Sequence, residues 1–128
     1  MRTLFLLALF VFPLSAQEVR QVATPEQVLA EVNQLRAARG LRPYMLDPAL
    51  AQGATACAIH RAQRGIAGHT HSDFSFLPAG CRASAAGCAA WPVSMGWGSC
   101  AIYDNYTYAG AGFCIGRDGR RYMSLFVR

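Results

Sequence analysis

The chain has 128 residues, a length that fits one domain and leaves no room for a second catalytic module. Charged residues make up 15% and hydrophobic residues 53%, which excludes a disordered or low-complexity chain. All 12 basic residues are arginine and the formal net charge is +5, but no run exceeds two arginines, so a nucleic-acid-binding surface is not expected.

The first residues have the pattern of a secretory signal peptide. Arg2 supplies one positive charge, an apolar run follows over residues 4–14, and small residues come next. The run is too short for a membrane-spanning helix, which needs about 20 residues. We therefore expect residues 1–16 to be a signal peptide and residues 17–24 an N-terminal extension. The protein is then secreted or periplasmic, with no membrane anchor after cleavage.

Two helices are predicted at the start of the remaining sequence, which we expect to form one domain over residues 25–128. Thr24 is placed to cap a helix over Pro25–Arg39, with proline at its first position and glycine after its end. Asp47 repeats this arrangement for a second helix over Pro48–Arg64. The predicted buried stripe of the second helix is mostly alanine, which permits the close approach of a neighbouring element.

The rest of the chain changes from loop to strand patterns. Between Gly65 and Gly98 the sequence predicts a long loop with one brief helix over Arg82–Trp91. Strand patterns over Tyr108–Ile115 and Arg121–Val127 then flank an Asp-Gly turn, which predicts a terminal antiparallel β-hairpin. Two helices followed by a hairpin predict an α+β domain.

Five cysteines follow the expected signal peptide, and disulfides persist in the compartment that it implies. At most two bridges can form, and one thiol is left over. We expect Cys100 to pair with Cys114 across the start of the hairpin, and Cys81 with Cys88 as the second choice. The spacing contains no Cys-x-x-Cys, which disfavours a structural zinc site.

Six stretches carry a family resemblance in order along the chain, among them His69–Thr70 after the second helix and the closing stretch Arg121–Phe126. Asn33–Pro43 and Leu46–Ala54 resemble the end of one helix and the start of the next. Ala90–Trp97 aligns without gaps on the pattern Ala-Trp-Met-Asn-Ser-Pro-Gly-His, and Tyr106–Gly112 resembles a Tyr-Thr followed by a Gly-x-Gly strand. These stretches are similar to the CAP superfamily, the secreted domain of cysteine-rich secretory proteins. The resemblance implies a reduced α-β-α sandwich with a small antiparallel sheet, held by disulfides.

The resemblance also implies a cleft in which two histidines and two glutamates hold a divalent metal. Only His69 matches that set, Trp97 takes the place of the second histidine, and no glutamate lies between His69 and Trp91. One imidazole cannot hold zinc tightly. We therefore expect a remnant cleft lined by His69, His71 and Trp97, with Trp91 and Trp97 buried in the space that the missing groups leave.

One local cluster, residues 69–73, could still carry chemistry, because it holds two imidazoles and a carboxylate. Side chains two residues apart point to opposite faces of an extended chain, so a metal site would need a turn or a ligand from the second helix. The weak metal candidates are His60, His69, His71 and Asp73. The alternative is a polar loop in which His69 forms only hydrogen bonds.

The expected function is that of an exported, non-enzymatic binding or interaction module with no cofactor. Its partner would be an extracellular protein, glycan or lipid, and the exclusive use of arginine favours a bacterial source. The alternative is a metal-dependent or thiol hydrolase that acts on a cell-wall, peptide or lipid substrate around His69 and His71. No serine has the Gly-x-Ser-x-Gly context of a nucleophile elbow.

Overall fold

The computed structural model describes residues 23–92, 96–98 and 100–128, with no description of the Cys100 side chain. The predicted signal peptide and most of the predicted N-terminal extension lie outside these residues. The described elements, in chain order, are α1 (Pro25–Ala38), β1 (Met45–Leu46), α2 (Pro48–Arg64), the short 3-10 helix η1 (Asp73–Phe76), β2 (Ala85–Pro92), the 3-10 helix η2 (Cys100–Tyr103), β3 (Tyr108–Ile115) and β4 (Arg120–Val127).

Both helices begin where the capping residues predict. The Thr24 hydroxyl accepts a hydrogen bond from the backbone N–H of Gln27, and the Gln27 side chain accepts one from the Thr24 N–H, which completes a capping box. The Asp47 carboxylate accepts from the first backbone N–H groups of α2, and Gly65 ends that helix in the left-handed conformation, with φ of 67°. The predicted bounds of α2 are therefore confirmed, and α1 ends one residue earlier than expected.

The sheet has four strands in the order β1-β3-β4-β2. The terminal hairpin is confirmed, because β3 and β4 pair antiparallel with Ala109 opposite Val127. The expected antiparallel sheet is formed by β2, β4 and β3, but β1 pairs parallel to β3 through Met45 and Leu46, so the whole sheet is mixed. The chain leaves β1 through α2 before it returns to the sheet, and a helical crossover of this kind allows a parallel neighbour.

The helix predicted over Arg82–Trp91 is also wrong, because β2 occupies Ala85–Pro92. Alanine favours a helix by intrinsic propensity, and that preference produced the prediction. In the fold every residue of β2 is paired with β4, from Ala85 opposite Val127 to Pro92 opposite Arg120. The ladder to β4 outweighs the local preference.

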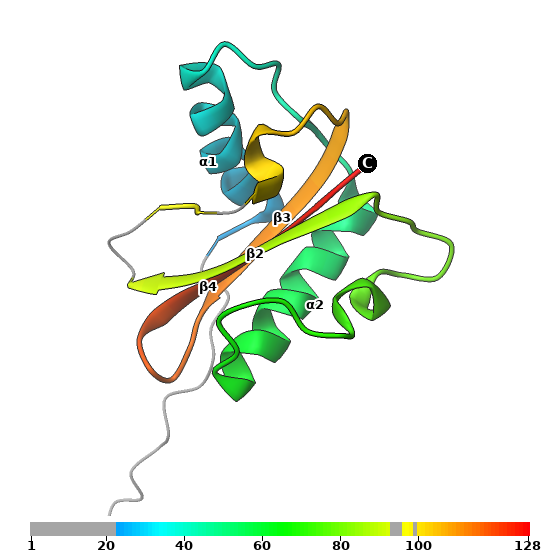
Figure 1. Cartoon of the computed structure of the whole chain (residues 1–128). Coiled ribbons are helices and arrows are strands. Elements are labelled where there is room, and N and C mark those ends of the chain that lie inside the picture. The colour runs from blue at the N-terminus through cyan, green and yellow to red at the C-terminus, as the bar shows by residue number, and fades with distance from the viewer. Residues whose placement is uncertain (1–22, 93–95, 99) are drawn as a thin grey trace, which may run out of the picture.

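The helices cover opposite faces of the sheet, as Figure 1 shows, so the predicted α-β-α sandwich and α+β class are confirmed. We call the side of the sheet that packs on α1 the α1 face and the other side the α2 face. The α1 face is built around large side chains, among them Val28, Val32, Trp97, Ile102, Phe113, Met123 and Leu125. The α2 face holds Leu50, Ala54, Cys57, Ala58, Ala62, Ala90, Cys114, Tyr122 and Phe126.

Two glycines of β3 allow α2 to lie directly on the sheet. A Cβ atom at Gly110 would lie 1.9 Å from the backbone nitrogen of Ala51, and one at Gly112 would lie 2.6 Å from the Cα of Thr55. The close approach expected from the alanine stripe is therefore present. In the part of the chain that the structure describes, no helix combines the length and apolar character needed to cross a bilayer.

Candidate functional site

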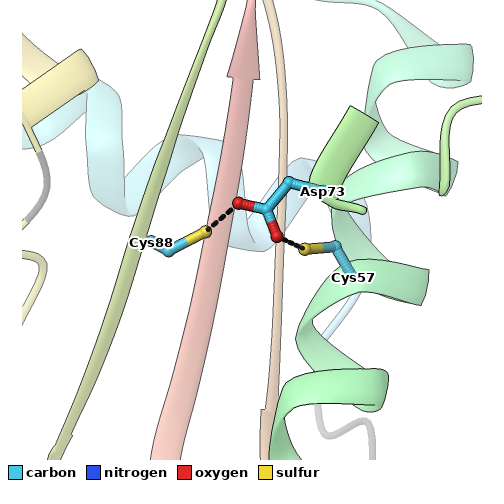
Figure 2. A group of neighbouring side chains, drawn as sticks. All are labelled: Cys57, Asp73 and Cys88. Carbon is cyan, nitrogen blue, oxygen red and sulfur yellow. Dashed lines mark hydrogen bonds between the residues drawn. The ribbon is translucent and has the colours of Figure 1, made fainter. Parts of the chain in front are cut away.

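Three chemically active side chains meet between α2 and the sheet, as Figure 2 shows. Cys57 projects from α2, Cys88 from β2, and Asp73 from the start of η1. The Cys57 and Asp73 side chains are buried and Cys88 is partly buried. The two sulfurs and a carboxylate oxygen all lie within 4.8 Å of one another. We call these three residues the thiol-carboxylate cluster.

Asp73 directs one carboxylate oxygen towards each thiol. The Cys57 Sγ lies 3.6 Å from Oδ1, and the Cys88 Sγ lies 3.8 Å from Oδ2. Thr70 donates to Oδ1 from its backbone N–H at 3.0 Å and from its hydroxyl at 2.7 Å. His69 Nδ1 lies 2.7 Å from Oδ2. The carboxylate is thus held on both oxygens by the loop that precedes it.

Hydrogen bonding decides the ionisation of Asp73. Burial opposes the charge and raises the pKa of this carboxyl, but the hydrogen bonds from Thr70 and His69 outweigh burial, so its pKa is lower than the ordinary value. Asp73 is therefore a carboxylate at neutral pH. A buried carboxylate needs such donors, because an unpaired buried charge is strongly unfavourable.

The two thiols differ in acidity because they share hydrogen bonds unequally. A hydrogen bond from the Cys57 thiol and the nearby Arg61 cation lower the pKa of Cys88 to about 7, against the opposing effect of burial. The hydrogen bond to Cys88, followed by burial, raises the pKa of Cys57. One thiol of the cluster thus ionises near neutral pH, while its neighbour stays protonated in the absence of a further cation.

Arg61 holds the loop of the cluster against the sheet. Its fully buried guanidinium donates to the Met123 carbonyl at 2.7 Å and to the Ser124 hydroxyl at 3.2 Å, both on β4. It also donates to the carbonyl of Ala89 on β2, and to the carbonyls of Ala67 and Gly68 after α2. One side chain of α2 therefore connects two strands with the start of the loop that carries His69 and Asp73.

The structure brings together only two of the four weak metal candidates, His69 and Asp73. His71 is exposed. His60 lies 2.7 Å from Arg64 through its Nδ1, and its ring packs on Phe76. The turn that a metal site at residues 69–73 requires is present. It places His69 and Thr70 in hydrogen-bond contact with Asp73, but it does not bring His69 and His71 together.

Trp97 lies on the other face of the sheet from His69. Its side chain is buried in the core of the α1 face, and its indole N–H donates to Glu31 Oε2 at 3.0 Å. Arg121 pairs with the same carboxylate. The burial expected for Trp97 is confirmed, whereas Trp91 is only partly buried. The structure therefore does not bring His69 and Trp97 into one cleft.

The four cysteines whose side chains the structure describes, Cys57, Cys81, Cys88 and Cys114, are free in it. The expected pairing of Cys100 with Cys114 lies outside the described residues, because the Cys100 side chain does. Cys81 lines a surface pocket and Cys88 faces Asp73, so the second choice, a bond between Cys81 and Cys88, is not formed in the structure.

The chemistry of the site is that of a donor cluster rather than of a hydrolytic triad. Asp73 lies between the imidazole and the thiols, so Cys57 and Cys88 form hydrogen bonds with each other, with Asp73 and with Ser124 rather than with His69. The sequence interpretation missed the cluster because Cys88 was placed in a helix. The position of Cys57 on the buried stripe of α2 could have predicted the cluster. A thiol on that stripe faces the sheet, and so can meet a second thiol on a neighbouring strand.

Two hollows lie elsewhere on the described surface. One, of about 310 Å³, lies between the start of α2, the loop before β2 and Arg128, and its lining includes Asp47 and Cys81. The other, of about 230 Å³, is lined by Arg42, Pro43, Met45, Tyr106 and Thr107 beside β1. Neither hollow is lined by a residue of the thiol-carboxylate cluster.

Comparison with known proteins gives one match. A search of curated proteins and a search of solved structures each found no matching protein. The model of the CAP family, described as the cysteine-rich secretory protein family, matches residues 29–127. That range runs from within α1 to the end of β4 and includes the thiol-carboxylate cluster. The chain therefore belongs to the CAP family of cysteine-rich secretory proteins.

Proposed function

We propose that this chain is an exported, non-enzymatic binding module, in which the metal cleft associated with the family is degenerate. The observation that carries the proposal is the state of Asp73. Its two oxygens already accept from Thr70 and His69 and face two thiols, in a position that is only 3% exposed. A general base must accept a proton from a substrate or a water molecule, and both oxygens of this carboxylate already accept hydrogen bonds from its own loop.

The position of Trp97 supports the same proposal. The residue that stands where the family resemblance expects a second histidine is buried on the α1 face and bonded to Glu31. His69 lies on the α2 face, beside Asp73. An arrangement with one imidazole on each side of a shared substrate is therefore not available to these two positions.

The surface beside β1 is the best candidate for the binding role. Met45 and Tyr108 are two of the large hydrophobic side chains that are exposed, at 59% and 39%. Met45 lines the hollow together with Arg42 and Tyr106. Tyr108 is paired with Met45 across β1 and β3, and Arg128 lies over its ring. Aromatic and arginine side chains are favoured at binding surfaces. We propose that an extracellular protein, glycan or lipid binds at this edge.

The catalytic half of the proposal is tested by turnover. Purified protein is assayed with ester and peptide substrates, with and without added zinc, beside the His69→Ala variant. We expect no turnover in any sample. Turnover that His69→Ala abolishes would establish the hydrolase alternative, and turnover lost only on alkylation of Cys88 would establish a thiol enzyme.

The binding half is tested by capture from the extracellular fraction of the source cells. Wild-type protein should retain a partner that the double variant Met45→Ser, Tyr108→Ser loses, while Phe74→Ser, a matched change at another exposed apolar side chain, keeps it. Equal capture by all three proteins would reject the β1 edge. Export itself predicts that the secreted protein begins at residue 17, which N-terminal sequencing reads directly.

A further inference from the structure

We propose that Cys57, Asp73 and Cys88 bind a thiophilic divalent cation of the zinc class. This site is distinct from the histidine-glutamate cleft that the family resemblance implies. It also goes beyond the proposed binding role, because it concerns residues that do not line the hollow beside β1. The donors are two sulfurs and a carboxylate oxygen, a set that suits zinc.

The distances between the donor atoms fit a tetrahedral ion. With Zn–S bonds of about 2.3 Å and Zn–O bonds of about 2.0 Å, the sulfur-to-oxygen edge of a tetrahedron is about 3.5 Å. Here the Cys57 Sγ lies 3.6 Å from Oδ1 and the Cys88 Sγ lies 3.8 Å from Oδ2, and the two sulfurs and one carboxylate oxygen all lie within 4.8 Å of one another. The three side chains can therefore share one ion once the carboxylate turns one oxygen towards both sulfurs, and water can fill the fourth position.

The carboxylate is also oriented as a metal ligand requires. Ligand carboxylates are usually fixed by hydrogen bonds from an outer ring of residues, and Thr70 and His69 supply those bonds to Asp73. The cluster lies near the surface, because the His69 side chain is 52% exposed and Cys88 is only partly buried. An ion can thus reach the donors from the side of His69.

The charges around the cluster balance once an ion is present. Binding releases the thiol protons of Cys57 and Cys88 to solvent, and the donors then carry three negative charges with Asp73. A divalent cation and the buried Arg61 cation supply three positive charges. The buried site is then electrically neutral, which removes the penalty of an uncompensated charge in the core.

A disulfide between Cys57 and Cys88 is the competing outcome for two neighbouring thiols. A disulfide would remove the thiol hydrogens beside the Asp73 carboxylate and, unlike a cation, would bring no positive charge to compensate the buried carboxylate. A disulfide would also not need a carboxylate beside the two sulfurs. The placement of Asp73 therefore favours the cation.

Cobalt binding to the reduced full-length protein tests the site. Co²⁺ bound to thiolates gives a ligand-to-metal absorption band that free Co²⁺ lacks, and Zn²⁺ should displace it. We expect one equivalent to bind, the band to disappear in Cys57→Ser and Cys88→Ser, and affinity to fall at least tenfold in Asp73→Asn. The matched controls Cys114→Ser and Cys81→Ser, at the two other free thiols among the described side chains, should keep the band.

A second measurement needs no substitution and so does not depend on the folding of the variants. The reduced wild type is alkylated with and without Zn²⁺, and the modified cysteines are located by peptide mass spectrometry. Zn²⁺ should protect Cys57 and Cys88 and leave Cys81 reactive. No cobalt band in the reduced wild type, a band that survives in folded Cys88→Ser, or a linked Cys57–Cys88 peptide that persists in protein isolated without oxidant would each overturn the proposal. Neither measurement uses hydrolytic turnover. The metal site can therefore fail its test while the non-enzymatic function passes its own, and the reverse.

Discussion

The two faces of the sheet are built by different means. On the α1 face, large side chains such as Trp97, Phe113 and Met123 fill the space under α1. On the α2 face, Gly110 and Gly112 remove side chains so that the helix backbone lies against β3. The first arrangement gains stability from apolar volume, and the second from close contact, in which a single added atom is disruptive.

The reactive side chains are also distributed unequally between the two faces. Each helix supplies a buried arginine to the face that it covers, Arg36 from α1 and Arg61 from α2. Arg36 donates to the carbonyls of Arg42, Ile102 and Asp104 and lies over the Tyr44 ring. Arg61 lies beside the thiol-carboxylate cluster and bonds Ser124, which itself contacts Cys88. The face that tolerates the least added volume is therefore the one that holds the reactive side chains.

The largest expected effect is on the α2 face. We expect Gly110→Ala to prevent stable folding, because the new Cβ would lie 1.9 Å from the Ala51 nitrogen and must displace helix backbone, at a cost of more than about 3 kcal/mol. Urea unfolding monitored by circular dichroism measures the effect. Gly68→Ala is the control, since a Cβ there meets nothing within 4 Å. A stable Gly110→Ala protein would mean that α2 does not lie on β3 as described.

Removal of apolar volume from the α1 face should rank second. We expect Trp97→Ala to lower the free energy of unfolding by about 3 to 5 kcal/mol, because the side chain is buried and its N–H bonds Glu31. Trp91→Ala, at a partly buried tryptophan, should cost less. The pattern of cysteine alkylation should stay unchanged in both, because the thiol-carboxylate cluster lies across the sheet. A changed pattern in Trp97→Ala would show that the two faces are coupled.

The two buried arginines, Arg61 and Arg36, allow a third comparison between the faces. We expect Arg61→Met to cost about 3 kcal/mol, because it leaves several buried carbonyls without donors. Arg36→Met should destabilise by a similar mechanism on the other face. Only Arg61→Met should slow alkylation of Cys88 near pH 7, since the nearby cation helps to lower the pKa of that thiol. Alkylation rates against pH decide this, and equal profiles in both variants would contradict it.

The smallest expected effect is at the start of α2. We expect Asp47→Ala to cost about 1 kcal/mol, because it removes the helix cap and the ion pair with Arg128. Burial raises the pKa of Asp47, but hydrogen bonds from Leu50 and Arg128 outweigh burial, and the pKa lies below the ordinary value of an aspartate. The contribution of the carboxylate is therefore complete above the ordinary pKa of about 3.9 and is lost as the pH falls through the lowered pKa. The stability gap between wild type and variant should narrow below about pH 4, and a gap independent of pH would contradict the assignment.

The sequence predicts the elements whose ends carry local signals. Asp47 with the proline after it, and Gly65, give α2 its bounds, and the Asp-Gly turn gives the hairpin. β2 is missed because its alanines favour a helix and only the pairing with β4 makes it a strand. β1 is missed because two residues are too few to show a period.

The candidate site is predicted only in part. His69 and Asp73 are four residues apart, so their proximity follows from local sequence. Cys57 and Cys88 come from a helix and a strand, and no spacing motif joins them. Their contact could be predicted only if residues 85–92 were first identified as a strand that packs on α2. For Trp97, the family resemblance of the stretch around it predicts its burial. The resemblance does not predict that Trp97 lies on the α1 face of the sheet.

The strand order has a consequence for the timing of folding. β4 pairs with both β2 and β3, so a chain emerging from the ribosome has made α1, α2 and β2 well before the strand that joins them appears. Pairing between β2 and β4 spans sequence separations of 28 residues, from Pro92 to Arg120, up to 42, from Ala85 to Val127. Contacts so far apart in sequence form slowly. The helices can form during synthesis, but the thiol-carboxylate cluster can assemble only after β4 has been made and has paired with β2.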